Sequence, residues 1–272
     1  MATATTPVKQ HEVVSHERWT EARKKFLAKE KEFTRLRDEL SRQRRELPWE
    51  RVEKPYVFEG PRGKETFADL FDGRGQLIVY HFMMGPGWAE GCKSCSYLSD
   101  HFDAMTIHLA HRDVTFGVIS HAPYAEIEAF QKRMGWRFHW VSSFGTDFNY
   151  DYHVSFNEEQ HAKGTIEYNY QSMKEAPIEE LPGASAFFKD ENGAIFHTYS
   201  TYARGLDILV GTYNFLDIAP KGRDEAGLAH TMAWVRHHDK YDGGYFVDPK
   251  AGWEHPKVAA NGSSCCGGKE HA

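Results

Sequence analysis

Three short apolar runs predict the core strands of a sheet. Residues 76–84, 114–120 and 137–141 are apolar almost throughout, as expected for strands that are covered on both faces. Two segments with helical spacing, 97–109 and 123–134, lie between them. A β-α-β-α-β series with short links implies parallel strands joined by right-handed crossovers.

A second pair of strands follows a weaker region. Residues 142–180 show little periodicity and are expected to form an inserted loop or short helices. Two apolar runs then flank an Asn-Gly turn, at 183–189 and 194–199, which predicts an antiparallel hairpin. The pattern at 208–215 predicts a final helix that covers the sheet. Together these elements predict an α/β protein with a mixed sheet.

A long helical pattern precedes the sheet. It begins after Ser15, a plausible N-cap, and extends from about His16 to Leu47, where Pro48 ends it. The segment 15–48 is expected to pack on its own domain or on a partner, and a long, narrow stripe is typical of a dimer contact. That stripe consists of Trp19, Ala22, Phe26, Phe33, Leu36 and Leu40.

The two ends of the chain differ from its centre. Residues 1–14 are polar and aperiodic, and residues 248–272 are rich in Gly, Pro and Ser, so both are expected to be mobile around one domain at 49–247. A net charge of -6 gives no reason to expect nucleic acid or an anionic membrane as a partner. The sequence shows neither a secretory signal nor an apolar run of membrane-spanning length, which indicates a cytoplasmic protein.

Candidate chemistry lies where the first core strand meets the next helix. The residues there are Gly91-Cys92-Lys93-Ser94-Cys95. A C-x-x-C pair in this position is typical of a redox site. Free N–H groups at a helix N-terminus favour a thiolate at Cys92, and Cys95 is close enough to close a disulfide one turn later. We therefore expect Cys92 to be the nucleophile and Cys95 the resolving thiol, with Lys93 adding positive charge.

A copper or zinc site is the alternative interpretation. Zinc normally requires a second pair of ligands, and His108 and His111 share one face of the predicted helix. The tail contributes Cys265 and Cys266. These two thiols could also exchange electrons with the C-x-x-C pair, or they could be incidental.

Three strings of residues carry a family resemblance. Residues 80–95, 144–151 and 196–205 resemble the bacterial thioredoxin-like family known as domain of unknown function 899. The likeness extends from the N-terminal helix to about Trp234. It implies a three-layer, thioredoxin-like fold and a dithiol-disulfide oxidoreductase that requires no bound cofactor. Such an enzyme would act on a disulfide or peroxide and take electrons from a thiol donor.

The chain departs from ordinary thioredoxins around the motif. Trp88 stands further from the first cysteine than the usual tryptophan. Pro182, counted back from the Asn-Gly turn, is offset by about one residue from the proline expected to face the disulfide. The inserted segment resembles peroxiredoxin-like relatives, which adds a peroxide-reducing variant through a sulfenic acid on Cys92. Arg204 could anchor an anionic substrate or form a salt bridge, and Tyr150 could wall the site or pack in the core.

Overall fold

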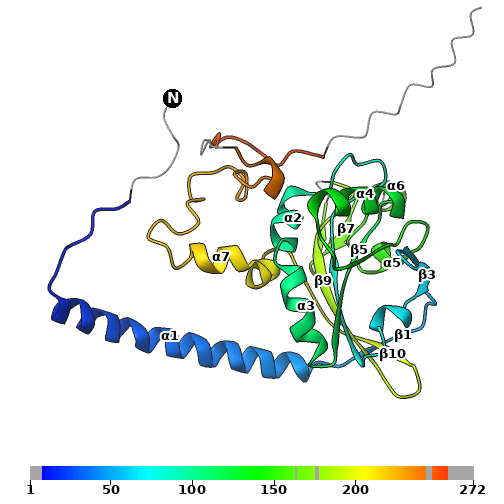
Figure 1. The fold of residues 1–272 in the computed structure, drawn as a ribbon, viewed down its shortest axis with the longest axis horizontal. Coiled ribbons are helices and arrows are strands. Elements are labelled where there is room, and N and C mark those ends of the chain that lie inside the picture. Colours follow the sequence, from blue (N-terminus) through cyan, green and yellow to red (C-terminus); the bar gives the residue numbers. More distant parts are fainter. Residues whose placement is uncertain (1–7, 163, 175–177, 243–246, 257–272) are drawn as a thin grey trace, which may run out of the picture.

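The sheet at the centre of the molecule has eight strands. The computed structural model describes residues 8–162, 164–174, 178–242 and 247–256, and it orders the strands β1-β10-β9-β4-β5-β6-β2-β3 (Figure 1). Two more strands, β7 (Ile166–Tyr168) and β8 (Gln171–Met173), form a separate hairpin. The strands of the main sheet are β1 (Glu50–Val52), β2 (Val57–Gly60), β3 (Gly63–Thr66), β4 (Gln76–His81), β5 (Val114–Ser120), β6 (His139–Ser142), β9 (Gly183–Lys189) and β10 (Ile195–Tyr202).

The strand directions confirm the expected mixed α/β sheet. β4, β5 and β6 are parallel, with Tyr80 of β4 opposite Val118 of β5. β9 is antiparallel to β4, with Gly183 opposite His81, and β10 is antiparallel to β9. The order β5-β4-β9-β10, with helices linking the parallel strands, is the thioredoxin-like arrangement.

Helices cover one face of this sheet. They are α2 (Lys93–Ser99), α3 (Phe102–Ala110), α4 (Tyr124–Met134) and α7 (Gly211–Leu216), with the 3-10 helix η2 (Ala203–Leu209) before α7. Their apolar side chains join those of the strands in one buried cluster around Phe82, Phe102 and Trp140. The helix expected at 97–109 is interrupted at Asp100 and His101.

Short elements cover the opposite face. They include η1 (Asp69–Phe71), α5 (Phe148–Asp151) and the β7–β8 hairpin, while α6 (Glu158–Ala162) follows α5 in the same inserted segment. A second buried cluster forms between this layer and the sheet, with Phe58, Phe148 and Phe187 among its largest side chains. The weakly patterned region 142–180 thus supplies a third layer.

The long N-terminal helix α1 (His16–Arg45) is present as expected. Ser15 caps it by accepting a hydrogen bond from the backbone N–H of Arg18 at 3.4 Å. None of its residues is buried, and Figure 1 shows it projecting beyond the body of the molecule. The predicted apolar stripe therefore does not pack on its own domain.

The C-terminal segment lies over the N-terminus of α2. It contains α7, a series of turns and η3 (His238–Lys240), and the described part ends at Pro256. Residues 248–256, which the composition of the chain places in the tail, contact the body through the rings of Trp253 and His255. Cys265 and Cys266 lie outside the described residues.

Candidate functional site

The loop after β4 holds Cys92 in a fixed position at the start of α2. Cys92 is the N-cap residue, and its backbone N–H donates to the carbonyl oxygen of Met83 at 3.0 Å. The ring Nε2 of His237 lies 2.8 Å from the carbonyl oxygen of Gly91. A Cβ atom on Gly91 would stand 2.5 Å from a ring carbon of Phe82 and 2.8 Å from one of Phe130. Only glycine therefore lets the loop approach the aromatic core so closely.

Cys92 and Cys95 are a pair of neighbouring free thiols. Each is 2% exposed, and their side chains are hydrogen-bonded to each other. The bond from Cys95 lowers the pKa of Cys92 from 9.0 to about 7, against the opposing effect of burial. Backbone N–H groups of Cys95 and Ser94 and the side chain of Trp253 contribute further hydrogen bonds in the same direction.

The second cysteine has the opposite character. Burial, together with the hydrogen bond and the negative charge of Cys92, raises the pKa of Cys95 well above its ordinary value. The hydroxyl of Tyr80 is hydrogen-bonded to Cys95, and burial holds the pKa of Tyr80 well above its ordinary value as well. At neutral pH the pair therefore favours a thiolate on Cys92 and a proton on Cys95.

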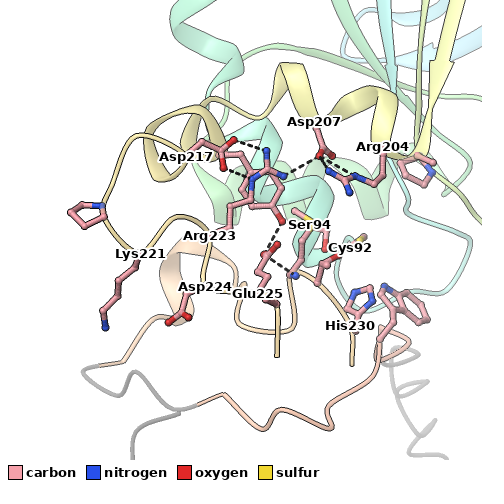
Figure 2. Close-up of a pocket in the computed structure, with 18 of the residues that line it drawn as sticks. Cys92, Ser94, Arg204, Asp207, Asp217, Lys221, Arg223, Asp224, Glu225 and His230 are labelled. Atoms are coloured by element: carbon pink, nitrogen blue, oxygen red, sulfur yellow. Dashed lines mark hydrogen bonds and ion pairs between the residues drawn. The ribbon is translucent and has the colours of Figure 1, made fainter. Parts of the chain in front are cut away.

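A cavity of about 1100 Å³ reaches Cys92 from the side of the C-terminal segment. Charged side chains form its outer part, and Figure 2 shows Arg223 held between Asp217 and Asp207, at 2.8 and 3.0 Å. The cavity thus gives Cys92 an approach between apolar and charged walls. Its lining also includes Met83, Ser94, Pro182, His230, Met232 and Trp253.

Pro182 directly precedes β9, which begins at Gly183, and it lines the same cavity as Cys92. Its carbonyl oxygen accepts a hydrogen bond from the hydroxyl of Tyr168 at 2.7 Å. The described residues contain no cis peptide bond.

The other predicted site residues are placed differently from one another. Trp88 is buried in the same cluster as the two cysteines, with its ring 4.9 Å from that of His255. Lys93 lines a neighbouring cavity, and burial lowers its pKa, with a smaller effect from Arg236.

Arg204 and Tyr150 lie further from the thiols. The Arg204 guanidinium is exposed at the cavity rim and pairs with Asp207 at 2.9 Å (Figure 2). Tyr150 instead faces His121, and the Tyr150 hydroxyl lies 3.3 Å from the His121 Nε2. The Nδ1 of His121 lies 3.0 Å from the buried carboxylate of Glu180. The structure thus brings Arg204, but not Tyr150, to the cavity of Cys92.

The candidate metal ligands are not gathered around the thiols. His108 and His111 are exposed at the end of α3, which leads into the start of β5, whereas Cys92 follows the carboxyl end of β4. Because β4 and β5 are parallel, the two histidines and Cys92 lie at opposite ends of these strands. Within the described ranges, no three His, Cys, Asp or Glu side chains form a group that could hold a metal ion.

Several residues near the pair were not predicted. The hydrophobic pattern identifies Tyr80 only as a residue of a core strand, and it places Trp253 in the tail. A single tryptophan in a polar segment is a sign that the segment packs against the domain, and Trp253 is such a residue. His230 carries a buried Nε2 for which the described residues provide no hydrogen-bond partner, and the sequence contained no signal for it.

Similar solved structures include a peroxidoxin, a bacterioferritin comigratory protein and a putative protein disulfide isomerase. The peroxidoxin BcpB from Mycobacterium tuberculosis is 12% identical, with 60% of this chain and 94% of that chain covered and a TM-score of 0.34. The Xanthomonas campestris bacterioferritin comigratory protein is 11% identical, with coverages of 60% and 95% and a TM-score of 0.37. A putative protein disulfide isomerase from Bacteroides thetaiotaomicron is 16% identical, with coverages of 62% and 92% and a TM-score of 0.32.

Sequence comparisons give a narrower result. No curated protein sequence matches this chain. No helix in the described ranges is long and apolar enough to cross a membrane. The family described as bacterial protein of unknown function (DUF899) matches residues 8–241, and the chain belongs to this family.

Proposed function

We propose that the protein is a thiol-disulfide oxidoreductase. The observation that supports this most strongly is the pair of neighbouring free thiols at the start of α2, of which Cys92 lines a cavity and has the lower pKa. A thiolate is the attacking species in disulfide exchange, and a pKa near the ambient pH gives the best compromise between ionisation and nucleophilicity.

The reaction proceeds in two exchanges. The Cys92 thiolate attacks one sulfur of a substrate disulfide, whose S–S bond breaks as the Cys92–substrate bond forms, and the departing thiolate takes up a proton. Cys95 then loses its proton and attacks the Cys92 sulfur, which releases the second substrate thiol. Two electrons have passed to the substrate, and an oxidised Cys92–Cys95 disulfide remains for a thiol donor to reduce.

The same geometry accounts for the order of the two steps. In the resting pair, the charge on Cys92 helps to keep the proton on Cys95. Formation of the mixed disulfide removes that charge, so the pKa of Cys95 falls when its attack is needed. The hydrogen bond from Tyr80 favours the Cys95 thiolate as it forms.

A peroxide is the second substrate class to test. In that variant the thiolate attacks one peroxide oxygen, the O–O bond breaks, and a sulfenic acid forms on Cys92, while the other oxygen takes up a proton and leaves as water or an alcohol. Cys95 then displaces water or hydroxide to give the same disulfide. We place either activity in the cytoplasm, where thiol donors maintain reduced cysteines, and neither needs a bound cofactor.

The test is turnover by protein purified without added metal. A small aromatic disulfide, or hydrogen peroxide, is supplied with dithiothreitol as the donor, and bound copper and zinc are measured on the same sample. We expect Cys92→Ser to abolish turnover, and we expect Cys95→Ser to accumulate a mixed disulfide with the aromatic substrate when no dithiothreitol is present. The variant that carries Ser at positions 265 and 266 is the control and should retain turnover.

Two outcomes would contradict the proposal. One is a Cys92→Ser variant that remains as active as the native protein. The other is stoichiometric copper or zinc together with thiols that form no reversible disulfide, which would favour the metal-binding alternative.

A further inference from the structure

The apolar face of α1 is exposed along the length of the helix. We call the side chains at every seventh position, Trp19, Phe26, Phe33 and Leu40, the heptad face. They are 57%, 58%, 64% and 52% exposed, respectively. Four large apolar side chains in one row on a helix without a single buried residue indicate a contact surface.

The repeat distinguishes between kinds of partner. A straight α-helix drifts by about 20° per heptad against a strict seven-residue repeat, so a row this regular stays on one side only if the helix supercoils around another helix. Docking on a globular surface would favour the 3.6-residue spacing instead. The row therefore fits a second helix as its partner.

We propose that the partner is α1 of a second copy, parallel and in register. In that arrangement each heptad-face residue meets its own counterpart, so every layer of this row is apolar. An antiparallel pair would set these side chains against the intervening positions, which include Lys29 and Gln43. In the parallel pair these two form polar layers, which help to fix the register, and the long Lys29 side chain can extend to solvent.

The charges beside the heptad face complement a parallel second copy. Consider the residue that immediately precedes each heptad-face residue. In a parallel coiled coil it lies close to the residue five positions later in the other helix. Glu32 then meets Arg37 of the second copy. Most of the equivalent pairs along the helix also join opposite charges. The attractive pairs are Lys25 with Glu30, Glu32 with Arg37 and Glu39 with Arg44, and the repulsive one is Arg18 with Arg23.

The ion pairs within α1 do not prevent these ion pairs with a second copy. Glu30 pairs with Arg23 at 2.8 Å and Glu39 with Arg42 at 2.6 Å, within the same helix. Both pairs are between exposed side chains, which contribute little each and can exchange partners. Arg44 lies over the ring of Tyr199 at 4.7 Å, so its contact with a second copy is made beside the domain.

The first experiment measures the mass of the full chain in solution by analytical ultracentrifugation over a range of micromolar concentrations. We expect a dimer, and we expect Phe33→Glu to weaken it by at least about tenfold in Kd because a carboxylate enters an apolar layer. Lys31→Glu, which faces away from the row, is the matched control and should leave the dimer intact. Because Phe33 is exposed in one chain, both variants should keep the native unfolding midpoint at concentrations low enough for the native chain to be monomeric. A monomer throughout, or a dimer indifferent to Phe33→Glu, would overturn the proposal.

The second experiment tests the orientation. Residues 32 and 37 are five positions apart and do not meet on one helix, so any energetic coupling between them comes from the other copy. Glu32→Arg alone should weaken the dimer, and the double variant Glu32→Arg/Arg37→Glu should recover it. A double variant that shows only the sum of the two single effects would overturn the parallel, in-register pairing.

Discussion

The side chain of Trp253 donates a hydrogen bond to the thiol of Cys92. Trp253 packs against the same buried cluster that contains both cysteines, and it lines the cavity that leads to Cys92. The proposed nucleophile is therefore covered by a residue from the last described part of the chain. Its position implies two separable effects, one on ionisation and one on access.

Two substitutions at Trp253 separate these effects. Trp253→Phe removes the indole N–H but keeps an aromatic ring, so we expect a higher Cys92 pKa and roughly three- to tenfold slower alkylation by iodoacetamide at pH 6. Trp253→Ala should show the same rise in the Cys92 pKa. Its rate above the pKa should however exceed that of the native protein, on the order of tenfold, because no ring has to move first. Equal alkylation rates for the Phe and Ala variants at high pH would show that Trp253 does not control access.

The pH dependence of alkylation tests the opposed protonation of the pair. The rate at Cys92 should rise with pH, with a midpoint of about 7, because the thiolate is the reacting form. Cys95→Ala removes the largest cause of the lowered pKa, so the midpoint should move toward 9.0. Cys95→Ser keeps a hydroxyl donor and should move it less. Mass spectrometry of the alkylated peptide assigns the reacting thiol, and a midpoint that stays near 7 in the Ala variant would contradict this account.

The fit of Gly91 against the aromatic core predicts a stability effect. Gly91→Ala places a methyl group against Phe82 and Phe130, and overpacking of this kind destabilises a fold by about 1–3 kcal/mol. Gly227→Ala is the control, because nothing lies within 4 Å of its added Cβ. The measurement is the free energy of unfolding in urea for both variants. Equal values would mean that the loop before Cys92 accommodates the methyl group without strain.

Much of the fold followed from the hydrophobic pattern. The strands β4, β5 and β9 are long and apolar, and β5 was predicted with the observed bounds, Val114–Ser120. β1 and β3, with three and four residues, are too short to show a period, and the β7–β8 hairpin lies in a weakly patterned insertion. Such strands form because neighbouring strands supply their hydrogen bonds. The hydrophobic pattern of the short segment itself contains no information about those neighbours.

The candidate site divides in the same way. Cys92 and Cys95 could be predicted because their chemistry follows from four consecutive residues at a strand-helix junction. Trp253, His230 and His237 reach the site from more than a hundred residues further along the chain, and their contacts depend on how turns fold over α2. No periodicity specifies such turns.

The most direct test is a redox titration of the native chain. Protein is equilibrated with mixtures of reduced and oxidised dithiothreitol or glutathione, free thiols are trapped with an alkylating reagent, and the Cys92 and Cys95 peptides are quantified by mass spectrometry. We expect both thiols to disappear together in one two-electron transition that yields a Cys92–Cys95 disulfide, and we expect Cys92→Ser to abolish the transition. Thiols that remain free under every buffer, or that oxidise without forming this disulfide, would contradict the account.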